Sequence, residues 1–392
     1  MTRLKKGILH GSLTLIGLAL LVLFVILPSY VDGKKNVVLD HAPYQISERA
    51  QTLHDSLRVA DLHADTLLWK RNPAKRQSRG HTDFVRLREG NVALQVFTTV
   101  TFVPKNMNTG ANTANKDAMT LLTIAQLWPI RTWSSIFERA TYQAQRLQKL
   151  EQNAGGDFII ARTQSDLANA LTKRHTNKNM LVGILGTEGA HPLEGKLENL
   201  DKLYAEGYRQ IGLQHFFDNE LGGSLHGVSK AGLSPFGREV IDAIADKGMI
   251  IDVAHSSVQT VKDVLAMTDA PIVISHTGIV SLCNHPDRNI PDHLLKQIAD
   301  RGGIIGVGYW ETAVCDTSPD GIAKMLIHGA NTFGVDHIAL GSDYDGAVTT
   351  RFDVSEIAVL TDALLKQGMS DDHIRKVMGE NQIAFYLKHL PK

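Results

Sequence analysis

The pattern of apolar and polar positions begins with one long apolar segment. From Gly7 to Val31 there is no Asp, Glu, Lys or Arg, and the apolar core of this segment is about 20 residues long, enough to cross a bilayer. Three basic residues precede it, Arg3, Lys5 and Lys6. This order predicts a single-pass transmembrane anchor over residues 1–35, with the rest of the chain on the exported, periplasmic or extracellular side. A cleaved signal peptide is the alternative.

Beyond a polar linker that ends near Ser47, apolar β-rich runs alternate with helical patterns. Eight runs are present: Leu57–Leu62, Val92–Val100, Met180–Thr187, Arg209–Gln214, Gly248–Ala254, Pro271–Ser275, Gly303–Tyr309 and His337–Ser342. Such alternation is typical of βα units that build a parallel sheet. Ser234-Pro235 has the form of a helix start and Gly248 that of a helix end. We predict an α/β fold, a (β/α)8 TIM-like barrel over residues 36–392.

One insertion interrupts this alternation, between the second and third runs. It extends from about Thr101 to Gln152, and its pattern is largely helical from Asn115 onward. We expect it to lie over the mouth of the barrel as a lid or a partner-facing element. The C-terminal segment, Ser370 to Leu390, predicts one amphipathic helix.

Composition narrows the possible functions. The 392 residues include 41 basic and 41 acidic side chains, a balance that gives no support to a nucleic-acid partner. Seventeen histidines justify a search for metal ligands, because imidazole is the commonest neutral ligand. Cys283 and Cys315 both lie in the predicted exported part, where they could form a disulfide or remain two buried thiols.

Candidate metal ligands follow six of the eight predicted strands. They are His63 and Asp65 after the first strand, Glu188 after the third, His215 after the fourth, His255 after the fifth, His276 after the sixth and Asp343 after the eighth. The C-terminal ends of barrel strands meet at one rim, where active sites form. His63 and Asp65 are two residues apart, so in an extended segment both point to one side. Each residue alone is more typical of a core position, but their convergence predicts a metal centre.

The combination of motifs resembles the renal (membrane) dipeptidases, which are zinc peptidases with amidohydrolase-type barrels. The resemblance extends from about Val59 to Phe385. The motifs that carry it are His63-Ala64-Asp65, Glu188-Gly189-Ala190-His191, Leu213-Gln214-His215, Gly232-Leu233-Ser234-Pro235-Phe236-Gly237, Ile251-Asp252-Val253-Ala254-His255, Ile274-Ser275-His276, Arg288-Asn289 and Gly341-Ser342-Asp343-Tyr344-Asp345-Gly346. No single motif would be sufficient.

This resemblance implies two zinc ions in each chain. One is held by His63 and Asp65 and the other by His255 and His276, while Glu188 bridges both. A bridging anion offsets the repulsion between two dications. The implied nucleophile is a hydroxide between the ions, which attacks the peptide bond of a dipeptide.

The same resemblance implies roles for further residues. His215 stabilises the substrate carbonyl as it becomes an oxyanion, Asp343 handles the proton of the departing amine, and Arg288 binds the free C-terminal carboxylate. The family's substrate-pocket tyrosine falls near Tyr309-Trp310, and either residue could replace it. The resemblance also implies a Cys283–Cys315 disulfide and a possible homodimer.

Two alternatives remain beside the dipeptidase. The first is an amidohydrolase acting on an ester, lactone, phosphotriester or N-acyl substrate; such barrels often use a carboxylated lysine as the metal bridge, whereas the bridging position here is Glu188. The second is a membrane-tethered binding protein without turnover on the same fold, in which we would expect at least one ligand to be lost. The preferred dipeptides and their stereochemistry are not determined by these patterns.

Overall fold

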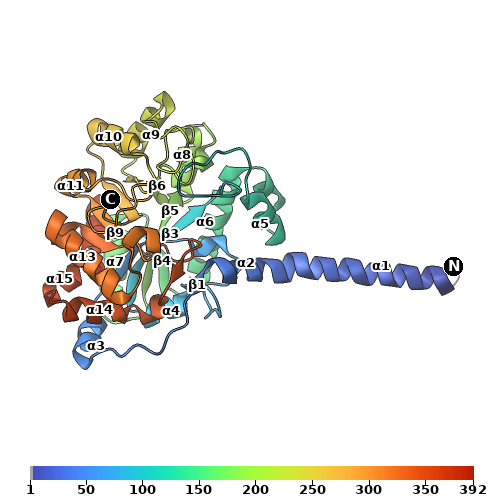
Figure 1. Ribbon diagram of the computed structural model, residues 1–392, viewed down its shortest axis with the longest axis horizontal. Helices are drawn as coiled ribbons and strands as arrows, with labels where there is room; N and C mark the ends of the chain where they lie inside the picture. Colours follow the sequence, from blue (N-terminus) through green and yellow to red (C-terminus); the bar gives the residue numbers. More distant parts are fainter. Residues whose placement is uncertain (1–2) are drawn as a thin grey trace.

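The computed structural model describes residues 3–392, without the side chains of 3, 4 and 6–9, so the predicted basic side chains of Arg3 and Lys6 lie outside the description. Parallel strands form a closed barrel with helices on its outside (Figure 1). Its strands are β2 (Val59–Ala64), β3 (Val92–Val100), β5 (Leu181–Glu188), β6 (Tyr208–Gly212), β7 (Ile250–Asp252), β8 (Ile272–Thr277), β9 (Ile304–Val307) and β10 (Ile338–Leu340). The ring closes where β3 pairs with β5. The predicted TIM-like barrel is confirmed.

Helices cover the barrel, which explains why its strands are apolar on both faces. The main outer helices are α4 (Phe84–Glu89), α7 (Gln164–Arg174), α8 (Glu198–Ala205), α9 (Pro235–Asp246), α10 (Val258–Met267), α11 (Asp292–Asp300), α13 (Pro319–Phe333), α14 (Ala358–Lys366) and α16 (Asn381–His389). As predicted, Ser234 caps α9 by accepting a hydrogen bond from the backbone N–H of Gly237. Gly248 follows the same helix with a positive φ of 62°, a conformation that glycine adopts without steric cost.

Two details differ from the predicted pattern. A short strand, β4 (Phe158–Ile160), pairs with the first residues of β5, ahead of the point where β6 joins it. The C-terminal segment is also broken into α15 (Asp371–Arg375), a π turn (Lys376–Glu380) and α16. The break allows Gly379 to pack on the backbone of Arg58, where a Cβ atom would lie 1.8 Å from the carbonyl oxygen.

The N-terminal helix projects from the barrel (Figure 1) and its inner end is attached to it. It comprises α1 (Arg3–Leu21), a π turn (Val22–Ile26) and α2 (Leu27–Lys35). Its segment His10–Lys35 contains an 18-residue window with a mean hydropathy of 2.5 and is long enough to cross a membrane, a criterion that an N-terminal signal sequence also meets. Directly after α2, β1 (Val37–Val38) pairs with β11 (Thr349–Thr350).

The insertion after β3 has two parts that lie differently. The long helix α6 (Ile136–Asn153) packs on the barrel, where Gln143 donates to the carbonyl of Val100 at 2.9 Å. The short helix α5 (Met119–Ala125) lies at the mouth of the barrel and contacts α2 (Figure 1). A 3₁₀ turn, Ile130–Trp133, connects the two helices.

Candidate metal centre

All the predicted strand-end residues converge at the C-terminal rim of the barrel and are buried there. Glu188 is the last residue of β5 and lies at their centre. Its Oε1 atom is 3.2 Å from His255 Nε2, 3.4 Å from His215 Nε2 and 3.6 Å from both His63 Nε2 and His276 Nε2. One carboxylate oxygen is thus surrounded by four imidazole nitrogens from four different strands or strand ends.

Hydrogen bonds on the outer side of the rings fix which nitrogen faces the centre. Ser275 Oγ lies 3.2 Å from Nδ1 of His63 and 2.9 Å from Nδ1 of His276. His226 Nε2 lies 2.9 Å from Nδ1 of His255. In each of these three rings the Nδ1 atom is therefore occupied and Nε2 points inward. Orientation of this kind is typical of metal-binding histidines.

The inward-facing Nε2 atoms of these histidines are better suited to binding a metal ion than to hydrogen-bonding with one another. His255 Nε2 and His276 Nε2 are only 2.8 Å apart, and within the described part of the chain His63 Nε2 has no hydrogen-bond partner although it is buried. A buried polar atom without a partner is costly. Nitrogen and carboxylate donors in this arrangement match the ligands that zinc prefers.

The ligand atoms form two groups that share Glu188. One contains His63, Glu188, His276 and Asp343, and the other contains Glu188, His215 and His255. The shared carboxylate is compatible with a bridging role. His255 and His276, which the family resemblance assigns to the same ion, belong to different groups, but their Nε2 atoms are only 2.8 Å apart.

Asp65 completes the rim beside His63. Its Oδ1 atom lies 3.6 Å from His63 Nε2 and accepts a hydrogen bond from the Thr98 hydroxyl at 2.6 Å. His63 in β2 and Asp65 directly after it therefore point to the same side, as predicted. Burial, together with the charge of Glu188, raises the pKa of Asp65.

Burial and mutual charge set the ionisation of the other groups. Burial alone would raise the pKa of Glu188, but His215, His63 and a hydrogen bond from His255 together hold it well below its ordinary value. Burial keeps the pKa of His255 and His276 low, so both rings are neutral, the form that binds metal. Asp343 has a raised pKa because it is buried and lies near other carboxylates.

Two of the site residues occupy the left-handed backbone region, which is uncommon for residues other than glycine. His255 has a φ of 62° and Asp343 a φ of 59°. Each carbonyl is held by one backbone hydrogen bond, from Leu225 at 2.7 Å and from Gly346 at 3.0 Å respectively. Strained conformations of this kind are retained at functional sites when the surroundings hold them.

Arg288 lies at one side of the centre. Its Nη2 atom donates to the carbonyl of His276 at 2.9 Å, and its guanidinium lies 4.7 Å from the centre of the Trp310 ring. Burial lowers its pKa to about 10, so it remains charged at neutral pH. Tyr309 packs instead against Tyr344 in the core. Of the two candidates in Tyr309-Trp310, Trp310 is therefore the one at the site.

The loops that follow β8 and β9, on either side of Arg288 in the sequence, are joined covalently. Cys283 and Cys315 form a disulfide that links positions 32 residues apart. Asn289 also ties these loops together, because its side chain accepts from the N–H of Gly278 and donates to the carbonyl of Cys283. The disulfide that the resemblance implies is present.

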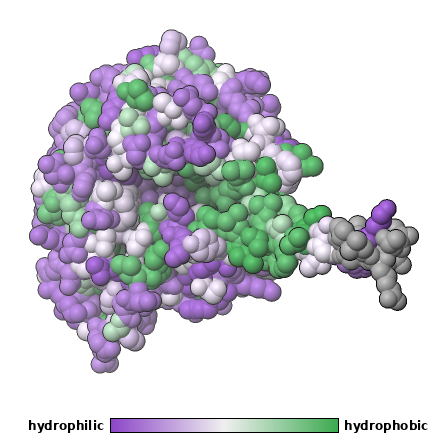
Figure 2. All heavy atoms as spheres, turned by 45° about the vertical axis from the view of Figure 1, so that its right-hand side comes forward, coloured by the Kyte–Doolittle hydropathy of each residue, from purple (hydrophilic) through white to green (hydrophobic). Residues whose placement is uncertain are grey.

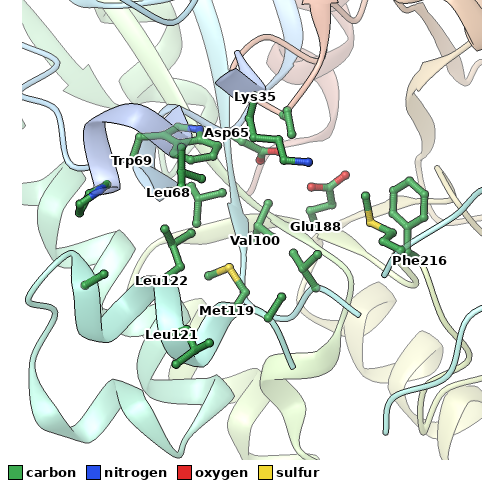
Figure 3. Close-up of a pocket in the computed structure, with 18 of the residues that line it drawn as sticks. Lys35, Asp65, Leu68, Trp69, Val100, Met119, Leu121, Leu122, Glu188 and Phe216 are labelled. Carbon is green, nitrogen blue, oxygen red and sulfur yellow. The ribbon is translucent and has the colours of Figure 1, made fainter. Parts of the chain in front are cut away.

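A cavity of about 320 Å³ leads away from the centre (Figure 3). The carboxylates of Asp65 and Glu188 lie near each other in its lining (Figure 3), and His215 also lines it. The remaining lining is mostly apolar: Leu27, Pro28, Val31, Leu68, Trp69, Val100, Val103, Met107, Ala118, Met119, Leu121, Leu122, Ala125, Phe216, Gly346 and Ala347. Lys35 also lines the cavity, and Figure 3 shows its amine toward the carboxylates of Asp65 and Glu188. This volume falls within the range of small-ligand sites.

Sequence reasoning did not identify the residues that orient the ligands. Ser275 belongs to the Ile274-Ser275-His276 motif, but the motif does not indicate that its hydroxyl orients two histidines. His226 belongs to none of the motifs. Asp61 accepts from the N–H of His63 at 3.0 Å and from the N–H of Ser342 at 2.9 Å, which fixes both strand ends. Of these orienting residues, Asp61 could have been suspected from the sequence, because it lies on the same strand as His63 and two residues before it.

Comparisons with known proteins agree with this geometry. The family profile described as membrane dipeptidase (peptidase family M19) matches residues 47–385. Dipeptidase verJ of Clonostachys rogersoniana is 31% identical over 229 residues, 57% of this chain and 58% of that protein. Dipeptidase tcpJ of Claviceps purpurea is 27% identical over 314 residues, 78% of this chain and 68% of that protein.

A solved structure shares the fold. It is a metallo peptidase from Rhodobacter sphaeroides, liganded with a phosphinate mimic of the dipeptide L-Ala-D-Ala. The sequences are 23% identical, the TM-score is 0.68, and the similarity covers 85% of this chain and 99% of the other. At this level of identity the likeness concerns the barrel architecture.

Proposed function

Because this chain belongs to the membrane dipeptidase family, peptidase family M19, we propose that it hydrolyses the peptide bond of dipeptides at a centre of two zinc ions. The observation that carries the proposal is the position of Glu188, whose Oε1 atom lies within 3.6 Å of four inward-facing imidazole nitrogens. A carboxylate in this position can be shared by two ions. The phosphinate dipeptide mimic bound to the Rhodobacter sphaeroides structure supports a dipeptide-sized substrate.

The proposed ligands are those implied by the family resemblance. His63 and Asp65 hold one zinc ion, His255 and His276 hold the other, and Glu188 contacts both. Bound zinc supplies a Lewis acid for the scissile carbonyl and lowers the pKa of a water molecule. The hydrogen bonds of Ser275 keep the rings of His63 and His276 in the orientation that binding requires.

Three residues act on the substrate itself. Asp343 Oδ1 lies 3.8 Å from His63 Nε2, and its raised pKa suits a group that accepts a proton and returns it to the departing amine. His215 directs Nε2 toward the centre and stabilises negative charge on the carbonyl oxygen. Arg288 binds the free C-terminal carboxylate, a role that its charge and its fixed position beside Trp310 support.

Replacement of Glu188 tests the metal bridge directly. Glu188→Ala removes the only carboxylate that lies close to all four imidazoles among the described residues. We expect loss of bound zinc, measured by elemental analysis, and loss of dipeptide hydrolysis by about 1,000-fold or more, the scale of removing a central electrostatic group. Circular dichroism should show a folded protein, because the barrel core is unchanged.

The control is Glu198→Ala, which removes an exposed carboxylate in the first turn of α8. It should retain zinc and activity. A Glu188→Ala protein with the zinc content of the wild type would contradict the bridging role. A wild-type protein that contains zinc but hydrolyses no member of a panel of L,L- and L,D-dipeptides would contradict the proposed function.

A further inference from the structure

The apolar segment of the N-terminal helix ends at the level of the barrel mouth. A bilayer core is crossed by about 20 helical residues. Counted from Gly7, which follows the basic start of the chain, this length extends to Ile26, the last residue of the π turn Val22–Ile26. For a helix that crosses a membrane, the outer boundary of the hydrocarbon core therefore falls at this turn.

A lysine of the barrel domain marks the same level. Pro28 has no N–H to bond the carbonyl four residues before it, which is that of Phe24. Lys70 Nζ donates to this carbonyl at 2.9 Å instead. Because an ammonium group stays in the hydrated zone of a membrane, the helix must leave the hydrocarbon core near Phe24. Helix length and this contact thus agree on the position of the boundary.

Further contacts hold the insertion beside this boundary. Helix α5 contacts both the π turn Val22–Ile26 and α2. Within α2, the buried Asp32 lies 3.0 Å from Arg71 Nε and 2.8 Å from Arg79 Nε. The surface formed by α5 and the turn that follows it is therefore kept at a fixed level along the helix, next to the expected surface of the bilayer.

Large apolar side chains are exposed on this surface. Leu121 of α5 is 73% exposed, and Leu127 and Ile130 after the helix are 57% and 75% exposed. Figure 2 shows a hydrophobic surface that continues from the N-terminal helix onto the adjacent part of the barrel domain. Among the described residues that line the cavity at the metal centre, Leu127 and Ile130 are absent. Contiguous exposed apolar surface marks an interaction site, and substrate binding does not explain these two residues.

Leu127 also occupies a position that favours glycine. Its φ is 58°, its N–H donates to the carbonyl of Ile124, and the N–H of Trp128 donates to the carbonyl of Thr123. This is the Schellman pattern at the end of a helix, in which glycine is the usual left-handed residue. A leucine there carries a steric cost and presents an apolar side chain to water. Neither effect favours folding, so the side chain is better explained by a partner outside the chain.

The charges around this surface suit anionic headgroups. Between residues 101 and 133 the basic residues are Lys105, Lys116 and Arg131, and the single acidic residue is Asp117. Asp117 is paired at 2.6 Å with Arg139, whereas Lys105 and Lys116 are exposed. Apolar side chains beside basic ones are typical of surfaces that bind anionic lipid.

We propose that the turn after α5 inserts Leu127 and Ile130 into the surface of the bilayer that the N-terminal helix crosses. The partner is a phospholipid bilayer with anionic headgroups. This inference rests on the predicted transmembrane helix and is independent of the reaction at the metal centre. A single helix can tilt in a bilayer, so a second contact with lipid would fix the orientation of the barrel as well as its distance from the membrane.

The test measures the depth of this surface in the membrane. The full-length protein is reconstituted into vesicles of phosphatidylcholine and phosphatidylglycerol, with an environment-sensitive fluorophore attached at Leu121→Cys or Ile130→Cys. Cys283 and Cys315 are joined in a disulfide, so the label enters only at the introduced thiol. We expect emission at shorter wavelengths, and quenching by lipids spin-labelled near the headgroup that is roughly threefold or more above the control, because interfacial side chains lie about 5–10 Å inside the headgroup boundary.

The matched control is Gln152→Cys, an exposed position near the end of α6 in the same insertion. Helix α6 leads to β4, whose Phe158 pairs with Leu181 at the start of β5, so Gln152 lies toward the end of the barrel opposite its mouth. A label there should remain unquenched by lipid.

A variant assigns the depth to the turn itself. Leu127→Gly combined with Ile130→Ser removes both apolar side chains, and we expect quenching at Leu121→Cys to fall by about twofold or more as the barrel tilts away from the lipid. Glycine suits the left-handed backbone at Leu127, so the midpoint of urea unfolding should not decrease. Leu127→Met combined with Ile130→Leu keeps both side chains apolar and should retain the quenching.

Each other result would overturn the inference for a different reason. Labels at Leu121→Cys and Ile130→Cys that are quenched no more than the label at Gln152→Cys, in a protein that sediments with membranes, would leave the anchor as the only contact with lipid. Quenching that is unchanged in the Gly-Ser variant would attribute the depth to the helix alone. Short-wavelength emission without quenching would place a second copy of the chain on this surface. A cleaved, soluble product would remove the anchor together with the inference, whatever the activity toward dipeptides.

Discussion

At the scale of single residues, buried histidines dominate the chemistry of this molecule. His191 lies behind the metal centre, stacked on Phe217 at 4.3 Å and within 3.2 Å of the Asn219 amide nitrogen. Gly189 leaves room for it, because a Cβ atom at that position would lie 2.4 Å from its Nε2 atom. Burial, and next the neighbouring His215, lower the pKa of His191 to about 3. The folded protein therefore keeps this ring neutral.

This low pKa predicts a loss of stability in acid. The unfolded chain binds a proton at His191 below its ordinary pKa of about 6.5, whereas the folded chain does so only near 3. The free energy of unfolding should therefore fall as the pH decreases from about 6.5, with His191 contributing about 1.4 kcal/mol per pH unit. His191→Leu should show a shallower slope by that amount between pH 6 and pH 4, measured by urea unfolding of both proteins in the presence of a chelator.

Comparison above pH 7 provides the control, because there the two stability curves should run parallel. Curves that are also parallel between pH 6 and pH 4 would contradict a neutral, buried His191. Buried histidines that do not interact with His191 contribute equally to both proteins, so most of the difference between the slopes comes from this ring and its interaction with His215.

The residue-scale predictions show what a sequence can and cannot reveal. His63, Asp65 and Glu188 were predictable because they follow apolar runs and match motifs at the strand ends. His226 was not, since its contact with His255 depends on a loop that returns to the rim from 29 positions away. The choice between Tyr309 and Trp310 also required the structure, because adjacent side chains diverge at the end of β9. The ligand roles and the number of zinc ions stay proposals.

At the scale of elements, the connection between α2 and the barrel is the feature that sequence patterns did not reveal. Alternation of β and helical runs was sufficient to predict the eight barrel strands, because each is apolar and bounded by helix signals. The short strands β1, β4 and β11 have no such pattern, since their stability depends on pairing with distant partners. The ion pairs of Asp32 are similarly long-range.

Loss of Asp32 should release α2 from the barrel. Asp32→Ala leaves the buried Arg71 without one of its two carboxylate partners, the other being Asp345 at 2.8 Å. We expect a destabilisation of about 3 kcal/mol, the scale of breaking a buried ion pair. Hydrogen exchange of the backbone amides should become faster at Val37–Val38 and Thr349–Thr350, where β1 and β11 pair.

Asp40→Ala is the matched control, because Asp40 is exposed in the segment that follows β1. It should change neither stability nor exchange. If Asp32→Ala also left exchange at the β1–β11 pair unchanged, the ion pairs would not be what holds α2 on the barrel.

At the scale of the whole molecule, a conventional barrel carries two additions at its mouth. Helix α5 of the insertion and the inner end of the N-terminal helix both lie at the rim where the strands end (Figure 1). The prediction that the chain is a peptidase is confirmed by its family. The division into an anchor over 1–35 and a barrel over 36–392 stays a prediction, as do export and a possible homodimer.

Retention of the helix predicts stable association with the membrane. The segment His10–Lys35 is long and apolar enough to cross a bilayer, and its inner end packs into the barrel through Asp32 and Val31. The expressed chain should sediment with membranes, resist extraction by salt or alkaline carbonate, and dissolve in detergent. Val22→Arg should weaken this association, since a central arginine costs about 3 kcal/mol on insertion.

Mass spectrometry of the purified protein distinguishes an anchor from a signal peptide. The anchored protein retains residues 1–35. A soluble product that begins beyond Val31 would contradict the anchor, and it would also lack Leu27, Pro28 and Val31, three α2 residues that line the cavity.

The attachment of α2 allows the helix almost no movement relative to the active site. A protein on a flexible linker explores a volume that grows with the length of the linker, whereas here the turn from helix to barrel is fixed by Asp32, Asn36 and β1. Anchored in this way, the enzyme would work at one constant height above the bilayer. Its turnover would then depend on how many substrate molecules occupy that thin layer, so amphipathic dipeptides enriched at the membrane surface would be consumed ahead of those free in the bulk solution.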